Sequence, residues 1–226
     1  MKKKVKYFLE EKNPLVLARR NKMRKRLKNG TPSFLCPNCI GGILFHDLGL
    51  RFQSPTVNLM ITQKDFVKFV LNMDAYLAGE FEFFEHESYT CPCAYLTGGG
   101  LEKIAIHFTH YHSPEEAVNK WKERAKRIDR DNLFVFLQER DGLTKDEIQA
   151  LASVQLKGLV VFTAHNYEDI PYALQIPEYE PAGEVGNILE KSWLNGTRKY
   201  EKHFDFVSWF NEANGVAQDV FRYRVK

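Results

Sequence analysis

The chain has 226 residues, of which 44% are hydrophobic and 27% charged, and its net charge is +3 at pH 7. These values are typical of a globular protein with a substantial core and exclude a minimal module. No apolar run approaches the roughly 18 residues that span a bilayer, and no signal-peptide pattern follows the lysine-rich start. We therefore expect a cytoplasmic protein.

The charge is distributed unevenly. Residues 1–28 contain twelve Lys or Arg and two Glu, a net charge of +10, whereas the other residues sum to −7. Asn13 as a cap and Pro14 in the first turn predict an amphipathic basic helix over residues 14–28, within an arm formed by residues 1–30. Such a helix either packs on the domain edge or docks peripherally on an anionic membrane at its inner face. Nucleic acid is disfavoured because no aromatic-rich binding motif or zinc finger accompanies the arm.

Beyond the arm, we expect one α/β domain over residues 31–226. The elements predicted in its first half are a short strand at 33–35, a helix at 40–48, a strand at 56–61, a helix from 62 to 79 and a hairpin at 98–100.

The second half begins with a strand over 103–111. Ser113, Pro114 and Glu116 then form a capping box that opens a helix, and Thr144 with Glu147 opens another. Apolar strands follow the two helices at 133–137 and 158–163, a further strand is expected at 172–176, and a last helix at 204–210. This alternation predicts βαβ units, and therefore a mixed, largely parallel sheet flanked by helices.

Four cysteines, Cys36, Cys39, Cys91 and Cys93, form a CxxC and a CxC pair that could meet around zinc. In a strand, residues two apart are separated by roughly 6.5 Å, so the CxC pair is poorly arranged for this. Reduced cytosolic thiols are usually inert. We therefore expect no metal and no cofactor.

Three histidines lie close together at His107, His110 and His112. In a strand His107 and His110 point to opposite faces, which disfavours a three-histidine metal site. Either of these two is a candidate acid/base, because imidazole titrates near neutrality.

The segment Asn38 to Gly42 precedes a predicted helix, where backbone N–H groups bind anions and favour a thiolate. Cys39 is a candidate nucleophile, with His46 and Asp47 one to two helical turns further on. The alternative is structural: the glycines permit close backbone packing, and Cys39 fills space.

The chain resembles a family of uncharacterised bacterial proteins often labelled exopolysaccharide or capsular polysaccharide biosynthesis proteins. The motifs that carry this resemblance are Asn38-Cys39-Ile40-Gly41-Gly42, His46-Asp47-Leu48-Gly49-Leu50, Ser54-Pro55-Thr56-Val57, Ile106-His107-Phe108, Trp121, Arg124, Arg127, Asn132-Leu133-Phe134, Arg140-Asp141-Gly142 and Val161-Phe162-Thr163-Ala164. The family label implies a pathway and leaves the reaction open.

Together these observations predict a transferase-like enzyme acting on a phosphate-bearing or lipid-linked sugar. Arginine forks are suited to phosphate and carboxylate groups. The candidate catalytic residues are Cys39, His46, Asp47, His107 and His110, and the candidate ligand-binding residues are Asn38, Gly41, Gly42, Ser54, Thr56, Trp121, Arg124, Arg127, Asn132, Arg140 and Asp141. The alternative is a non-catalytic component that binds a glycan or a partner in the same machinery.

Overall fold

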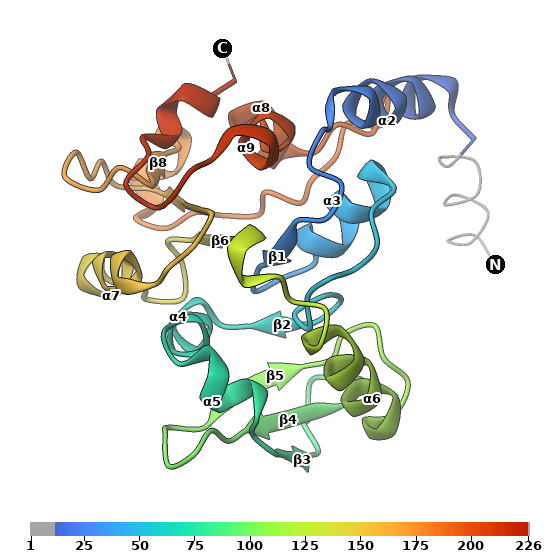
Figure 1. Cartoon of the computed structure of the whole chain (residues 1–226), viewed down its shortest axis with the longest axis vertical. Helices are drawn as coiled ribbons and strands as arrows, with labels where there is room; N and C mark the ends of the chain where they lie inside the picture. The colour runs from blue at the N-terminus through green and yellow to red at the C-terminus, as the bar shows by residue number, and fades with distance from the viewer. Residues whose placement is uncertain (1–11, 226) are drawn as a thin grey trace.

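Two four-stranded sheets organise the computed structural model, which describes residues 12–225 (Figure 1). The first sheet is parallel, in the order β1 (Ser33–Leu35), β6 (Leu133–Gln138), β7 (Gly158–Thr163) and β8 (Ala173–Gln175). The second is antiparallel, in the order β2 (Met60–Ile61), β5 (Ile104–His107), β4 (Cys93–Leu96) and β3 (Phe81–Phe84). The predicted α/β class is confirmed, but two sheets replace the expected single mixed sheet.

Helices surround both sheets. The α-helices are α2 (Pro14–Arg26), α3 (Ile40–Leu48), α4 (Gln63–Leu71), α5 (Met73–Leu77), α6 (Pro114–Ala125), α7 (Lys145–Ala150), α8 (Lys199–His203) and α9 (Phe206–Glu212). Short 3-10 turns are η1 (Arg130–Asn132), η2 (Leu151–Ser153), η3 (Pro177–Ala182) and η4 (Val220–Tyr223). Between residues 12 and 225, no helix is long and apolar enough to cross a bilayer.

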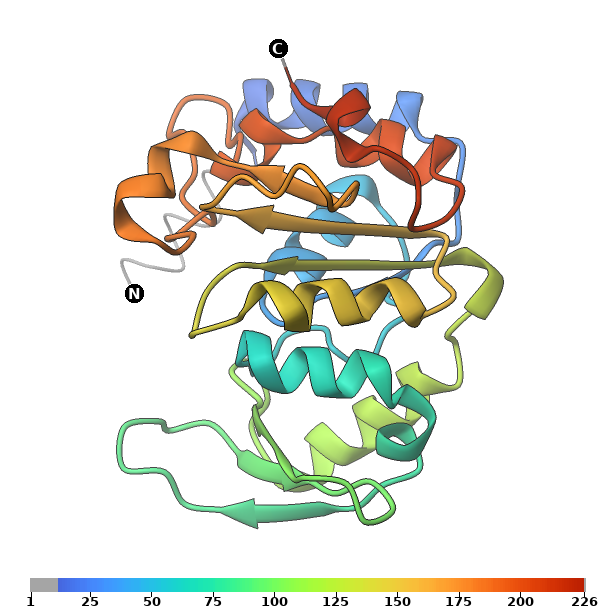
Figure 2. The ribbon, with the colours of Figure 1, turned by 90° about the vertical axis from the view of Figure 1, so that its left-hand side faces the viewer.

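Aromatic side chains fix the packing on one face of the parallel sheet. Phe34 of β1 contacts Phe45 of α3 as well as Trp209 and Phe210 of α9. Phe134 of β6 contacts the same two residues of α9. On the other side, α7 and α4 lie between the parallel and antiparallel sheets (Figures 1 and 2). One hydrophobic core therefore runs through both halves of the molecule.

The antiparallel sheet is covered by α6, whose Trp121 is 2% exposed and packs against Phe69 of α4 and Phe81 of β3. The predicted hairpin at 98–100 is confirmed, since it joins β4 to β5. Because β5 pairs with β4 and β2, the segment from β5 through α6 to β6 is not a βαβ unit, contrary to the prediction. The unit formed by β6, α7 and β7 is confirmed.

Local cap chemistry was a reliable guide to the helices. Ser113 accepts from Glu116 N–H, and Thr144 and Glu147 form a reciprocal capping box. The helix predicted over 62–79 is instead two helices, because Asn72 leaves the helical conformation (φ −128°, ψ 38°). The strand predicted over 56–61 shortens to β2, and the strand over 103–111 ends at His107, after which a turn brings Tyr111 N–H to Phe108 O.

The basic helix predicted from Pro14 forms as α2, with Asn13 as its cap. A separate basic arm is not confirmed, because α2 packs on α3 and α9 at the top of the molecule (Figure 1). Residues 1–11 of the predicted arm lie outside the described residues.

Candidate functional site

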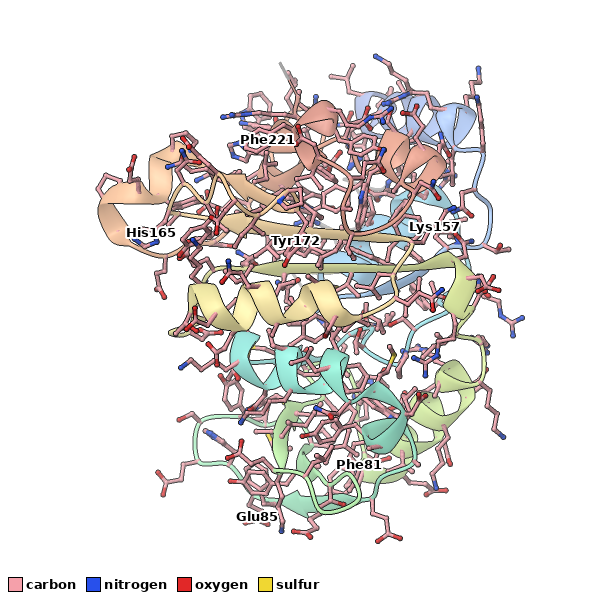
Figure 3. All side chains as sticks on the ribbon, turned by 60° about the vertical axis from the view of Figure 1, so that its left-hand side comes forward. Phe81, Glu85, Lys157, His165, Tyr172 and Phe221 are labelled. Carbon is pink, nitrogen blue, oxygen red and sulfur yellow. The ribbon has the colours of Figure 1, made fainter. Side chains whose placement is uncertain are left out.

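The carboxyl ends of β1, β6 and β7 meet at one edge of the parallel sheet. In open α/β sheets, ligands bind in the crevice beyond this edge. Figure 3 shows His165 at this end of the molecule and Lys157, which precedes β7, at the opposite end. Chemically active side chains that follow these strands are therefore the first candidates for a site.

Glu139, directly after β6, is the centre of a hydrogen-bond cluster at this edge. Its side chain is only 5% exposed. One carboxylate oxygen accepts the backbone N–H groups of Ala164 (2.7 Å) and His165 (3.1 Å). The other oxygen lies 2.7 Å from His165 Nδ1 and 2.5 Å from the Tyr167 hydroxyl, which donates to it. The imidazole itself is half exposed, with its side chain 51% accessible.

These donors keep Glu139 ionised. Burial alone would raise the pKa of the Glu139 carboxyl, but hydrogen bonds from Tyr167, His165 and Ala164 outweigh it and the pKa is lowered. Burial and the neighbouring carboxylate raise the pKa of the Tyr167 hydroxyl. Because an ionised carboxylate can only accept, Nδ1 of His165 carries the proton, and Nε2 is the basic nitrogen of the neutral ring.

Amide side chains connect this cluster to the end of β1. Asn38 Nδ2 donates to Gln138 Oε1 (3.0 Å), and Gln138 Nε2 donates to the carbonyl of Gly186 (3.2 Å). Asn38 also caps α3 through its side-chain oxygen, which accepts Ile40 N–H. Adjacent strands are about 4.8 Å apart, so the ends of β1 and β7 are separated by about 10 Å. A single small substrate could contact both.

The loop after β6 carries backbone strain. Asp141 has φ 58°, a left-handed conformation that is uncommon for a non-glycine residue and often found at functional sites. Its carboxylate accepts Gln63 N–H, and its own N–H donates to Glu184. Arg140 beside it is half-buried at the same edge and lies 3.6 Å from the Asp141 carboxylate.

Cys39, after β1, lies 3.5 Å from His110 Nε2. Burial raises the pKa of the Cys39 thiol, while a hydrogen bond with Thr109 and the positive charge of Arg198 lower it less strongly. The histidine paired with Cys39 is therefore His110, from the turn after β5. The sequence had suggested His46, which lies on the exposed side of α3.

The start of α3 supports the structural interpretation of its glycines. A Cβ on Gly41 would lie 2.8 Å from Cys36 Sγ, and one on Gly42 would lie 2.6 Å from Asn58 Oδ1. Cys36 accepts Gly41 N–H and donates to the Asn38 carbonyl. Burial raises the pKa of its thiol to about 12. Gly41 and Gly42 thus let the helix approach its neighbours closely.

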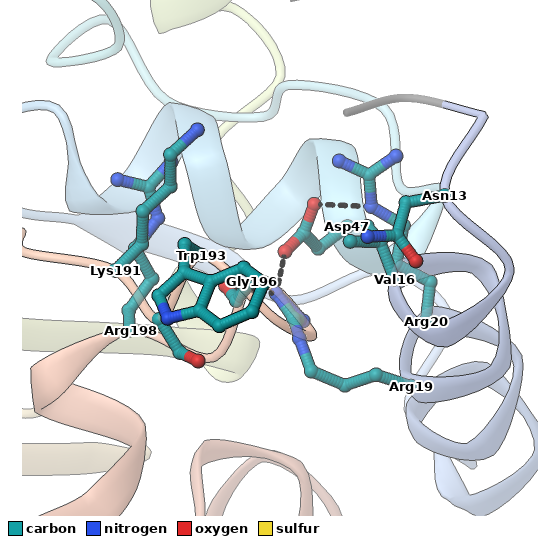
Figure 4. Close-up of a pocket in the computed structure, with 10 residues that line it drawn as sticks. Asn13, Val16, Arg19, Arg20, Asp47, Lys191, Trp193, Gly196 and Arg198 are labelled. Atoms are coloured by element: carbon teal, nitrogen blue, oxygen red, sulfur yellow. Dashed lines mark hydrogen bonds and ion pairs between the residues drawn. The ribbon is translucent and has the colours of Figure 1, made fainter. Parts of the chain in front are cut away.

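Asp47, at the far end of α3, is held by α2. Its two carboxylate oxygens pair with Arg19 and with Arg20 (2.7 Å), as the dashed lines in Figure 4 show. These residues border a pocket of about 60 Å³ between α2, α3 and the 191–198 loop, with Trp193 and Arg198 on its other side. The geometry assigns Asp47 to anchoring α2, away from the Cys39–His110 pair.

His107 and His110 lie in different environments, but not on opposite faces of one strand as predicted, because β5 ends at His107 and His110 lies in the turn after it. His107 is buried within the antiparallel sheet, 3.4 Å from Cys93 Sγ, with the rings of His86 and Tyr89 against it. Burial and the charge of His86 lower the pKa of His107. The two histidines therefore do not share a site.

Most of the other predicted ligand-binding residues bond within the protein. Arg124, 9% exposed, donates to the Val57 carbonyl and the Tyr111 hydroxyl. Arg127 donates to the Phe52 carbonyl and pairs with Glu123. The remaining members are Ser54 and Thr56, buried and bonded to each other, Trp121 in the core, and Asn132, bonded to Asn29.

The expected arginine cluster is not formed. Arg124 and Arg127 precede β6, whereas Arg140 follows it, and a six-residue strand spans about 20 Å. Of the predicted set, Asn38, Cys39, His110, Arg140 and Asp141 lie at the carboxyl edge, together with Gly41 and Gly42 in the first turn of α3 and Thr56, whose Oγ1 accepts Cys36 N–H.

The cysteine pairs do not meet around a metal. Cys36 and Cys39 lie at the parallel sheet, whereas Cys91 and Cys93 lie at the antiparallel one. Across residues 12–225, no three His, Cys, Asp or Glu side chains are grouped so that they could hold an ion.

Sequence reasoning missed Glu139, His165, Tyr167 and Arg198. A signal existed for the first two, because polar residues that directly follow buried parallel strands are typical of α/β binding sites. Nothing local singles out Arg198, which reaches the site from the loop before α8.

Two comparisons place the chain among known sequences. The model of the family described as Domain of unknown function (DUF1919) matches residues 12–211. A Haemophilus influenzae protein described as "Uncharacterized protein" is 38% identical over 192 residues, which cover 84% of this chain and 89% of that protein. Neither description states a reaction or a polysaccharide, so the predicted pathway stays a prediction. The chain belongs to the DUF1919 family and has a bacterial relative in Haemophilus influenzae.

Proposed function

We propose that this protein is a transferase-like enzyme of surface polysaccharide biosynthesis, acting on a phosphate-bearing or lipid-linked sugar at the carboxyl edge of the parallel sheet. The observation that carries the proposal is the hydrogen bond of His165 to the buried carboxylate of Glu139. The pathway is suggested by the family resemblance alone, and the chemistry by the geometry.

In this mechanism His165 is the general base. Glu139 fixes the tautomer and orientation of the ring and stabilises the imidazolium that forms. Nε2, which has no bonding partner among residues 12–225, removes the proton from an acceptor hydroxyl as that oxygen attacks the sugar donor. The phosphate-bearing leaving group departs with the electron pair of the broken bond.

Cationic side chains near the edge are suited to that leaving group. Arg140 lies in the loop after β6, and Arg198 is close enough to Cys39 to lower the pKa of its thiol. Guanidinium groups bind phosphate oxygens through two parallel hydrogen bonds. Cys39 and His110 lie at the same edge, after β1, where they would contact the substrate.

A non-catalytic glycan-binding role is the second candidate. The observation that favours it is Trp193, whose ring is 88% exposed beside the pocket in Figure 4. Exposed aromatic rings offer a flat apolar surface with a polar atom, which suits a sugar face. Such a role needs no proton transfer and is independent of His165.

A complementation experiment separates the two. A strain lacking the gene is supplied with wild type, His165→Asn or the control His112→Asn, a surface histidine on the antiparallel side, and surface hexose is measured. We expect His112→Asn to restore the polysaccharide and His165→Asn to fail at equal protein levels.

The purified proteins are then incubated with UDP-, GDP- and CMP-linked sugars and a polyprenyl diphosphate-linked sugar, whose hydroxyl groups are the acceptors, and nucleotide release is measured. Loss of a general base lowers turnover by about 10²- to 10⁴-fold. Full restoration of the polysaccharide by His165→Asn would overturn the enzymatic proposal and favour the binding role.

A further inference from the structure

The arginines and the lysines of α2 differ in their partners. Residues 12–46 contain no Asp or Glu. The arginines turn toward the body: Arg19 and Arg20 pair with Asp47, and Arg26 pairs with Asp205. Arg24 donates to the Asp47 carbonyl (2.8 Å). These contacts hold α2 in place.

The lysines take no part in these contacts. Lys22, Lys25 and Lys28 are exposed, and none has a side-chain ion pair within residues 12–225. Lys22 and Lys25 lie three positions apart on the helix surface, and Lys28 follows the extended residue Leu27 that ends α2. Lys22 borders a pocket that Glu201 and Asp205 also line, but no acidic residue lies in the sequence between residues 12 and 46. Compact, flexible lysine charges attract anions through long-range electrostatics.

Large apolar side chains are exposed at the same corner. Leu15 and Leu17 of α2 are 49% and 44% exposed, and Leu194 is 50% exposed. The loop containing Trp193 and Leu194 is fastened to the first turn of α2, because Asn13 Nδ2 donates to the Leu194 carbonyl (3.0 Å). Figure 4 shows the Trp193 ring beside this part of α2.

We propose that this surface, consisting of the exposed residues Leu15, Leu17, Lys22 and Lys25 of α2, Lys28 just after it and the loop Trp193–Leu194, docks on an anionic lipid bilayer. Lysines attract acidic headgroups, leucines enter the acyl boundary, and tryptophan prefers the interface between them. Nucleic acid offers the lysines the same charge but leaves four apolar side chains without a partner. The combination therefore favours a membrane surface.

Docking would bring the proposed active site close to the bilayer. Arg198 follows Leu194 by four residues, a span of at most about 14 Å. A lipid-linked substrate held in the bilayer could then reach the carboxyl edge of the parallel sheet. Docking itself does not depend on the proposed chemistry, and the two can be tested separately.

The test is co-sedimentation of the full chain with vesicles of phosphatidylcholine alone or with 30% phosphatidylglycerol. We expect binding to the anionic vesicles that weakens with salt, because the lysine contribution is screened. Each lysine near an anionic surface contributes about fivefold to affinity, so Lys22→Gln/Lys25→Gln should bind about 25-fold more weakly. The matched control is Lys122→Gln/Lys126→Gln, which removes an exposed lysine of α6 and the exposed lysine that follows its last residue, and should bind as wild type does.

The apolar part is tested with Trp193→Ala/Leu194→Ala, which should lose the binding that persists at high salt. Circular dichroism spectra identical to wild type show that these surface variants fold. The proposal is overturned if the chain does not bind anionic vesicles, if the two double-lysine variants weaken binding equally, or if duplex DNA displaces the vesicles. His165→Asn should bind vesicles normally, so failure of the enzymatic proposal would leave this result intact.

Discussion

Nδ1 of His165 lies 2.7 Å from Oε1 of Glu139, and this contact joins the ends of two neighbouring parallel strands. A buried carboxylate that orients a half-exposed imidazole is the arrangement that fixes the tautomer of a general base. It occurs at the edge of the sheet where α/β proteins bind their ligands. The site therefore combines the right chemistry with the expected position.

The Glu139 carboxylate is expected to make stability depend on pH. Burial raises the pKa of the Glu139 carboxyl, but hydrogen bonds outweigh burial and lower the folded-state pKa below the ordinary 4.5. Its contribution is therefore present above pH 4.5 and is lost as the pH falls through the folded-state pKa. Glu139→Gln should unfold about 1–3 kcal/mol more easily at pH 7, because buried donors lose their charged acceptor.

Urea unfolding between pH 7 and pH 3.5 measures this effect. The difference between wild type and Glu139→Gln should shrink as the pH falls, whereas Glu168→Gln, at an exposed position nearby, should follow wild type throughout. A constant difference across this range would contradict the assigned role of the carboxylate.

Asp47 is expected to be a stability residue. Its side chain is 6% exposed and pairs with two arginines that are themselves largely buried. Removing one partner of such a network leaves uncompensated charge, so Asp47→Asn should cost about 3 kcal/mol. Urea denaturation gives this value, and limited proteolysis should show earlier cleavage between α2 and β1. Asp146→Asn, on the exposed side of α7, is the control. Equal stability of the two variants would contradict the role of Asp47 in holding α2 on α3.

The cysteines of the CxxC pair are expected to react differently. Cys36 is buried with a thiol pKa raised to about 12, whereas Cys39 is partly exposed beside His110. Iodoacetamide should therefore modify Cys39 first, and faster as the pH rises from 7 to 9.5, because burial raises the Cys39 pKa too. Peptide mass spectrometry follows each site. His110→Ala should slow the modification of Cys39 by iodoacetamide at pH 7.5. An unchanged modification rate would show that the two side chains do not interact chemically.

Predictions from sequence succeeded where the cause was local. The capped starts of α6 and α7 depend on residues three apart, and the continuous apolar runs of β6 and β7 depend on burial alone. Pairing partners are nonlocal, and so β5 was assigned to the wrong kind of unit. The hairpin at 98–100 was predicted, but the second partner of β5 is β2, more than 40 residues earlier, and alternation of apolar residues does not show that this pairing builds a separate antiparallel sheet.

The site was predictable only in part, because contacts between residues that are distant in the sequence also decide which side chains meet there. Asn38 and Cys39 adjoin a recognisable strand–glycine–helix pattern, and both lie at the edge of the sheet. Arg124 and Arg127 were interpreted as ligand-binding, because sequence does not reveal that backbone carbonyls of residues 52 and 57 already bind them. Glu139 and His165 are 26 residues apart, and only the parallel pairing of their strands brings them together.

Because it depends on that pairing, the Glu139–His165 contact also reports the register of β6 and β7. Gln138 of β6 is aligned with Phe162 of β7, and the next residue, Glu139, donates its N–H to the Phe162 carbonyl (2.7 Å). A slip of one residue would turn every side chain of β7 to the opposite face and carry His165 away from the carboxylate. The contact thus exists in one alignment of the strands and in no neighbouring one. A spectroscopic signal from the His165 ring would report correct registration of the sheet while the chain folds.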